Sequence, residues 1–287
     1  MKLHKKDTIL IVGLGLIGGS YARALTKKGY RVTAITKDQT DIDYALREGI
    51  IASGAAYPDD TLIKEAKLVV FALYPQIFIE WIRTYQHLFA TSTILTDVTG
   101  VKGSVVYTVQ EMLREDVEFI AAHPMAGREV YGVQNSDEHI FHGANYIVTP
   151  TDKNTEDAIT LCEHLGEELG FAKISRLSPA AHDDMIGFLS QLTHCIAITL
   201  MNCNQSEHLE NYTGDSFRDL TRIARINDEM WSELFLANRE QLLAHMDAFS
   251  DTFTAFRTLL ETKDRDGMRT AMQNATARRA LFDKKKG

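Results

Sequence analysis

The chain has 287 residues, of which 45% are hydrophobic and 24% charged, a balance typical of a globular protein with a buried core. Its net charge of −8 argues against a nucleic-acid-binding surface, which needs an excess of basic side chains. The length is sufficient for two domains.

Membrane, secretion and metal signals are missing from the sequence. No run of roughly 18 apolar residues predicts a membrane span, and the short, charged segment before Thr8 does not resemble a signal peptide. The histidines have no metal-ligand spacing, and the cysteines form no motif: Cys162, Cys195 and Cys203. We therefore expect a cytoplasmic protein with no metal, membrane partner or nucleic-acid partner.

The first predicted elements form a βαβ unit. The β-branched run Thr8–Val12 predicts a strand, and a glycine-rich turn follows it at once. Gly19–Lys28 predicts a helix that Gly29 ends, and Arg31–Thr36 predicts the second strand.

Strands and helices continue to alternate up to residue 177. The predicted helices are Asp41–Glu48, Phe78–Leu88, Val105–Leu113 and Thr155–Leu169. The predicted strands are Leu68–Leu73, Thr93–Thr96, Val117–Ala121, Asn145–Thr149 and Ala172–Ile174. Continuous apolar strands separated by helices indicate a parallel sheet covered on both faces. We expect an α/β protein whose Rossmann-type dinucleotide-binding domain spans residues 1–177.

The remaining residues, 178–287, predict an all-helical domain. Ser178 followed by Pro179 is a typical helix start, and no convincing strand follows. Met185–Met201 is apolar on nearly every face, which predicts a helix buried on all sides and a homodimer built on this domain. Glu229–Glu261 predicts another long helical stretch.

The glycine-rich turn predicts a dinucleotide site. Gly13 allows the tight turn, Gly15 allows the backbone to approach a pyrophosphate, and Gly18 lets the helix pack on the sheet. Leu16 and Ile17 stand at the helix N-terminus, whose free N–H groups attract phosphates. The alternative is a glycine-rich turn without a ligand.

The end of the second strand bears on the choice of cofactor. Thr36 and Lys37 stand where NAD enzymes usually have a carboxylate, and a hydroxyl with a cation suits the 2′-phosphate of NADP. The sequence therefore predicts NAD(P) binding, with NADP favoured over NAD. The alternative is that Asp38 reaches back to the ribose while Lys37 is solvated.

His123 is the candidate catalytic residue, because it follows a predicted strand and histidine titrates near physiological pH. We expect it at the carboxyl edge of the sheet, where ligands bind in open parallel sheets. From position alone, a structural histidine in a turn is the alternative.

From Ile9 to roughly Arg279 the chain resembles the prephenate/arogenate dehydrogenase family of tyrosine biosynthesis. The motifs that carry this resemblance are Gly13–Ser20, Thr96-Asp97-Val98, Val101-Lys102-Gly103, His123-Pro124-Met125-Ala126-Gly127, Ser178-Pro179, His182-Asp183, Ser190, Leu192, His194, Phe217–Ala224 and Trp231.

The resemblance implies an oxidative decarboxylation of prephenate, or of arogenate, with hydride transfer to NAD(P). It implies that His123 is the base and that Arg222 and His194 bind the dicarboxylate substrate. Arg128, with Gly127 beside it, is a second candidate for a substrate carboxylate.

The chain departs from the family pattern at Gly100, where a serine is usual and where Thr99 is a possible substitute. His182 ranks below His194 as a substrate residue, because twelve residues on a straight helix separate them by ~18 Å. Two alternatives remain open. One is a β-hydroxyacid or imine dehydrogenase, which would need a lysine on the first helix of the second domain. The other is a non-catalytic nucleotide sensor.

Overall fold

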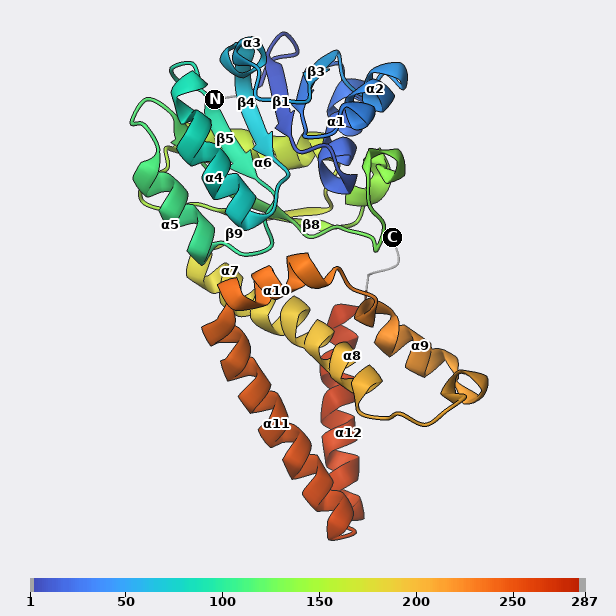
Figure 1. Cartoon of the computed structure of the whole chain (residues 1–287). Coiled ribbons are helices and arrows are strands. Elements are labelled where there is room, and N and C mark those ends of the chain that lie inside the picture. The colour runs from blue at the N-terminus through green and yellow to red at the C-terminus, as the bar shows by residue number, and fades with distance from the viewer. Residues whose placement is uncertain (1–2, 284–287) are drawn as a thin grey trace. The chain divides into compact units, whose positions relative to one another are not determined.

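A six-stranded parallel sheet organises the first part of the chain (Figure 1). The computed structural model describes residues 3–283 and divides into two compact units, the first ending at Asn238 and the second beginning at Arg239. The strand order is β3-β2-β1-β4-β5-β6, formed by Ser53–Ala55, Arg31–Ile35, Thr8–Val12, Ala66–Phe71, Ile94–Asp97 and Glu118–Phe119 respectively.

Helices cover both faces of this sheet, as the continuous apolar strands predict. Ile9 and Ile11 of β1 pack into one core cluster, and Leu10 and Val12 pack into the other, because successive side chains point to opposite faces. The helices are α1 (Leu16–Lys27), α2 (Gln39–Arg47), α3 (Asp60–Glu65), α4 (Pro75–Tyr85), α5 (Gly103–Met112) and α6 (Glu156–Leu169).

A second sheet has three strands, and the sequence did not predict it. Its order is β7-β8-β9, formed by Ala121–Pro124, Asn145–Thr149 and Lys173–Arg176. The expected single strand Val117–Ala121 is wrong, since β6 ends at Phe119 and β7 pairs antiparallel with β8. His123 therefore lies within β7, opposite Ile147, and not at the edge of the parallel sheet.

Helices complete the first unit. Ser178 caps α7 (Pro179–Ile186) by accepting from the Ala181 amide, as predicted. The chain continues through a π-helix, Gly187–Leu192, into α8 (Thr193–Asn202), and then through α9 (Asp215–Thr221), the 3-10 turn Arg222–Ala224 and α10 (Asp228–Ala237). Other 3-10 turns are Gln86–Leu88, Val133–Asn135, Glu138–Phe141, Leu209–Tyr212 and Ala280–Phe282.

The apolar stretch Met185–Met201 is not buried on all sides in the single chain. Leu189 is 44% exposed and Met201 is 48% exposed. By length and composition alone, the helical stretch Pro179–Asn202 is also apolar enough to cross a membrane, contrary to our expectation from the sequence. In addition, the π-helix divides this apolar stretch between two α-helices, α7 and α8.

The second unit contains α11 (Arg239–Glu261) and α12 (Arg265–Arg279), which contact each other, and Asp264 caps α12. The expected long helical stretch Glu229–Glu261 is confirmed, as the two helices α10 and α11. It breaks at Asn238, whose buried side chain donates to the carbonyl of Asp183 and to Oε1 of Gln191.

Candidate active site

The glycine-rich turn connects β1 to α1 and has the geometry that the sequence predicts. Gly13 has a φ of +97°, and a Cβ there would lie 2.4 Å from the carbonyl oxygen of Ala72. At Gly18 a Cβ would lie 1.9 Å from the carbonyl oxygen of Gly13. Both positions therefore require glycine, one for the turn and one for the close approach of helix and strand.

Gly15 differs from these two because no atom lies within 4 Å of where its Cβ would be. The helix that begins at Leu16 has no side-chain cap and no acidic residue in its first turn. The helix N-terminus at Leu16 and Ile17 is therefore without a side-chain cap, and the space beside Gly15 is open. This is the arrangement that fits the pyrophosphate of a dinucleotide.

The residues proposed to read the ribose stand beside this turn. Strand β2 ends at Ile35, whose carbonyl accepts from the Gly13 amide at 2.8 Å, so Thr36 and Lys37 follow directly. Asp38 is the N-cap residue of α2, yet its side chain makes no capping hydrogen bond. The three positions therefore directly follow the strand end that is hydrogen-bonded to the glycine turn.

The loop that follows His123 is fastened to the same helix α1. The Asp137 amide donates to the Ser20 hydroxyl at 3.0 Å, and Arg23 Nε donates to the Ser136 hydroxyl at 2.7 Å. A Cβ at Gly19 would lie 2.8 Å from the Cβ of Ser136. The strand carrying His123 and the helix of the nucleotide turn are thus held together through this loop.

His123 forms a chain of hydrogen bonds with two consecutive residues of α7. Its Nδ1 lies 2.9 Å from Nε2 of His182, and Nδ1 of His182 lies 2.8 Å from Oδ1 of Asp183. A carboxylate accepts only, so His182 donates from Nδ1 and accepts at Nε2, and His123 donates from Nδ1. The free lone pair of His123 is then at Nε2, the nitrogen a general base uses.

Asp183 is itself fixed at the N-terminus of α5. Its two carboxylate oxygens accept from the backbone amides of Lys102 at 2.8 Å and Gly103 at 2.7 Å. The helix dipole adds a favourable interaction with the negative charge. This arrangement fixes the carboxylate and, through His182, the orientation of the His123 ring.

Both imidazoles favour the uncharged state. The pKa of His123 is held well below its ordinary value by burial, and further by His182 and the Lys102 cation. The pKa of His182 is lowered by burial and by Lys102, although the hydrogen bond to Asp183 opposes the shift. His123 therefore keeps an available lone pair at physiological pH.

Gly100 lies next to His123. A Cβ at this position would be 3.9 Å from Cε1 of His123 and 3.7 Å from the methyl groups of Leu234. Thr99 does not take the place of the family serine, because its buried hydroxyl bonds to Asp97 and to the carbonyl of Val101.

His194 and Arg222 belong to a second group of side chains. The His194 ring stacks on Trp231 with ring centroids 3.8 Å apart, and its Nδ1 donates to the Ser190 carbonyl at 2.8 Å. Arg222 forms an ion pair with Glu129, the sixth residue after His123, and both charges act on the His194 imidazole. Burial is the largest influence and lowers the pKa of His194.

Helix α10 connects the two groups. Trp231 contacts His194. Leu234 lies one turn later on the same face of α10, and its methyl groups lie beside Gly100, which is next to His123. The Leu234 carbonyl accepts from Gln191 in the π-helix at 2.9 Å. The π-helix and α10 thus join the His123 group to the His194 group.

Arg128 and Gly127 are placed differently. Arg128 is exposed and bonds at 2.9 Å to Asp137 within its own loop, and no hydrogen bond joins it to His123 in the described part of the chain. Gly127 is exposed, and a Cβ there would meet nothing within 4 Å.

The sequence analysis ranked His182 too low, and it assigned no role to Asp183 or Glu129. The adjacent pair His182-Asp183, directly after the Ser178 helix start, was the available signal. The assumption of a straight helix concealed its meaning, because the π-helix between His182 and His194 changes both the rise and the direction of the side chains.

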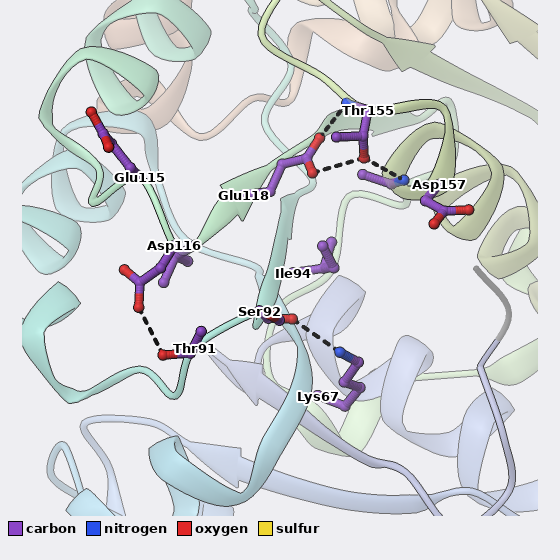
Figure 2. A pocket seen from close by; sticks show the side chains of 11 residues that line it. Lys67, Thr91, Ser92, Ile94, Glu115, Asp116, Glu118, Thr155 and Asp157 are labelled. Atoms are coloured by element: carbon purple, nitrogen blue, oxygen red, sulfur yellow. Dashed lines mark hydrogen bonds between the residues drawn. The ribbon is translucent and has the colours of Figure 1, made fainter.

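A pocket of about 380 Å³ lies elsewhere, at the amino ends of β4, β5 and β6, as Figure 2 shows. Its polar side chains bond to one another: Glu118 accepts from Thr155, and Asp116 accepts from Thr91. The glycine turn and His123 do not line it, so we assign no role in the reaction to this pocket.

Comparison with known proteins identifies the family. The model of the prephenate dehydrogenase nucleotide-binding domain matches residues 21–175, and that of the prephenate dehydrogenase dimerization domain matches residues 178–274. The chain is 32% identical to the prephenate dehydrogenase of Bacillus subtilis, over 92% of this chain and 72% of that protein. It is 29% identical to a cyclohexadienyl dehydrogenase of Zymomonas mobilis, over 90% of each.

A solved structure has the same fold over nearly the whole length. The crystal structure of prephenate dehydrogenase from Aquifex aeolicus, in complex with hydroxyphenyl propionate and NAD+, matches with a TM-score of 0.89 at 26% identity. The match covers 98% of this chain and 100% of that one. The chain therefore belongs to the prephenate dehydrogenase family.

Proposed function

We propose that this chain is an NAD(P)-dependent enzyme that converts prephenate to 4-hydroxyphenylpyruvate by oxidative decarboxylation. The observation that carries the proposal is the free Nε2 of His123. Asp183 and His182 orient this nitrogen, and it belongs to a strand whose following loop is fastened to the nucleotide helix. Arogenate, which has an amino acid side chain in place of the pyruvyl one, is the alternative substrate.

In this reaction His123 accepts the proton of the ring hydroxyl at Nε2. A bound nicotinamide supplies the acceptor for the hydride, which leaves the ring carbon that bears this hydroxyl. The ring carboxylate leaves as CO₂, and the electrons of the broken C–C bond complete the aromatic ring. The resulting phenolate oxygen then takes back the proton from His123, which gives the phenol and restores the base. The imidazole contributes ~10²–10⁴-fold as a general base, and its low pKa keeps it deprotonated in the resting protein.

Arg222 is the proposed ligand of a substrate carboxylate, because a guanidinium can hold one through two parallel hydrogen bonds. Its present partner is Glu129, and the two side chains are 63% and 42% exposed. An ion pair this exposed is worth at most ~1 kcal/mol, so an incoming carboxylate can replace Glu129 at little cost. His194 would complete the site: its Nδ1 donates to the Ser190 carbonyl, which leaves Nε2 of the neutral ring as an acceptor for a polar group of the substrate.

Further assignments rest on the sequence reasoning. Gly13, Gly15, Leu16, Ile17 and Gly18 hold the pyrophosphate in this proposal. Thr36 and Lys37 then read the 2′-phosphate of NADP in preference to NAD, with Asp38 as the competing ligand of a ribose hydroxyl.

The proposed domain boundary lies between residues 177 and 178, with a cytoplasmic homodimer built on 178–287. The exposed side chains of Leu189 and Met201 support that interface, since a dimer would cover apolar surface. Light scattering at micromolar concentration tests it, and a monomer would contradict it.

The decisive experiment measures cofactor reduction with prephenate and with arogenate in the parent protein and in His123→Asn. We expect the variant to bind cofactor normally and to lose at least a hundredfold in kcat, in line with the ~10²–10⁴-fold contribution of a general base. His87→Asn, at an exposed histidine outside the site, is the matched control.

Three other outcomes would contradict the proposal. Turnover of a 3-hydroxy acid alone would indicate a β-hydroxyacid dehydrogenase. Cofactor binding without any turnover would indicate a nucleotide sensor. A drop in kcat of less than ~10-fold would remove His123 from the mechanism.

A further inference from the structure

A buried ion pair lies behind His123, and the reaction described above uses neither of its members. Asp97 ends β5, and Lys102 is the N-cap residue of α5. Lys102 Nζ lies 2.7 Å from Oδ2 of Asp97, and both side chains are 0% exposed.

The contacts of Lys102 match an ammonium group. Its Nζ donates to Asp97 Oδ2 at 2.7 Å, to the Ala122 carbonyl at 2.6 Å and to the Thr99 hydroxyl at 3.3 Å. An ammonium has three N–H donors, whereas a neutral amine has two. Three acceptors around one nitrogen therefore fit the charged form.

The pair holds both backbone polar groups of one residue. The Ala122 amide donates to Asp97 Oδ1 at 3.0 Å, and the Ala122 carbonyl accepts from Lys102. Ala122 directly precedes His123 in β7. The position of the His123 backbone is therefore fixed from one side by the pairing with β8 and from the other by these two charges.

Stability alone is a poor reason for this arrangement. Removing two charges from water is costly, and replacing a buried ion pair with uncharged residues of similar volume is often neutral or stabilising. The contacts with Ala122 suggest instead that the charges serve the neighbouring imidazole.

The charged and titratable groups around His123 come from three elements: Asp97 from β5, Lys102 from the start of α5, and His182 with Asp183 from α7. The Lys102 cation disfavours protonation of both His123 and His182. The Asp97 carboxylate opposes this at His182. The Lys102 cation, which is bonded to the residue before His123, therefore lowers the pKa of the base directly.

We propose that Lys102 and Asp97 are positioning residues, which hold the strand bearing His123, and with it the imidazole, in place. The inference rests on the proposed role of His123 as the base. In this inference the ion pair affects the reaction only through His123, and neither Lys102 nor Asp97 contacts the substrate.

The test uses the double variant Lys102→Met/Asp97→Asn, which leaves no buried charge without a partner. Loss of the cation favours the protonated imidazole, so the acidic limb of the kcat/KM profile should move to higher pH, by about one unit. Loss of the Lys102 contact with the Ala122 carbonyl should lower kcat at the pH plateau by about 10- to 100-fold. The KM for the cofactor should not change. Lys102→Arg keeps the cation and should leave the limb where it is in the parent.

Arg114→Met is the matched control. Arg114 also bonds to an aspartate, Asp116, and to two backbone carbonyls, those of Gln86 and Phe89, but none of these contacts involves His123. Its loss should change neither the pH profile nor kcat.

An NMR titration of the His123 imidazole without substrate, assigned by comparison with His123→Asn, separates this inference from the proposed function. An unchanged titration in an active double variant would overturn the inference, as would a double variant that fails to fold, since the pair would then be a requirement of the fold. A shifted titration in a protein that turns over neither prephenate nor arogenate would support the inference and refute the function.

Discussion

His182→Phe tests the hydrogen-bond chain that orients the base. The side chain of His182 is fully buried, so a phenyl ring of similar shape keeps the packing and removes both nitrogens. Two hydrogen bonds disappear, of 2.9 Å to His123 and 2.8 Å to Asp183. Asp183 keeps its two backbone donors, so the main loss is at Nδ1 of His123.

A buried donor without an acceptor costs ~1–3 kcal/mol. If that cost falls on the reactive orientation of the ring, kcat should drop by roughly 5- to 150-fold. The His123 proton is then also free to move to Nε2, which would remove the lone pair from the substrate side.

The assay is the initial rate of cofactor reduction at saturating substrate, with the cofactor KM and the thermal midpoint measured in parallel. His182→Gln is the matched variant, because its amide oxygen can accept at the place of Nε2, and it should recover part of kcat. If His182→Phe stays within ~3-fold of the parent in kcat while folding normally, the chain of hydrogen bonds does not orient the base.

Four further outcomes can be measured. Arg222→Gln should raise substrate KM by ~10- to 100-fold and leave cofactor KM unchanged, because a charge-assisted contact is lost. If only Arg128→Gln raises substrate KM, Arg128 and not Arg222 binds the carboxylate. Thr36→Asp should shift kcat/KM from NADP toward NAD, and an unchanged ratio would remove this residue from the cofactor site. Gly100→Ser should fold with equal or greater stability by ~0.4–1 kcal/mol, since its Cβ meets only ordinary contacts, and a lower thermal midpoint would contradict that geometry. Because the folded pKa of His123 is depressed, the unfolded chain binds this proton first, so unfolding free energy should fall as pH drops below ~6.5; urea titrations that show no decline would refute the shift.

Local patterns predicted the elements that depend on near neighbours in the chain. The apolar run Thr8–Val12, the glycine turn after it and the Ser178 helix start are all confirmed. Each rests on the preference of a few consecutive residues for one backbone geometry. The family resemblance, which depends on motifs of the same local kind, is confirmed by the comparisons.

The second sheet depended on contacts that sequence does not display. The chain leaves the parallel sheet after Phe119, and the amide of Ala122 bonds to the carboxylate of Asp97, 25 residues away. Nothing in the apolar run Val117–Ala121 distinguishes one continuous strand from two short ones. The same limit applies at Asn238, where contacts with α7 and the π-helix end a helix that periodicity alone would continue.

The candidate site was predictable as a set of residue types and not as a geometry. His123 carries the free nitrogen that its motif suggested, and His194 and Arg222 stand near one another, as expected for a shared ligand. Their proposed roles remain to be tested. The orienting role of His182 depends on contacts between distant segments: His182 bonds to His123 of β7, and its neighbour Asp183 bonds to backbone amides at the start of α5.

The π-helix Gly187–Leu192 sets the angular phase between the two halves of this site. Each residue of an α-helix advances the side-chain direction by ~100°. Deleting one residue from this turn would let a regular helix form and would rotate every later side chain about the axis relative to His182. Trp231 and Arg222 would then face a different surface of α8. The length of this short turn is therefore under stronger constraint than the identity of its exposed residues, such as Leu189, and natural variation here should appear as substitution and not as insertion or deletion.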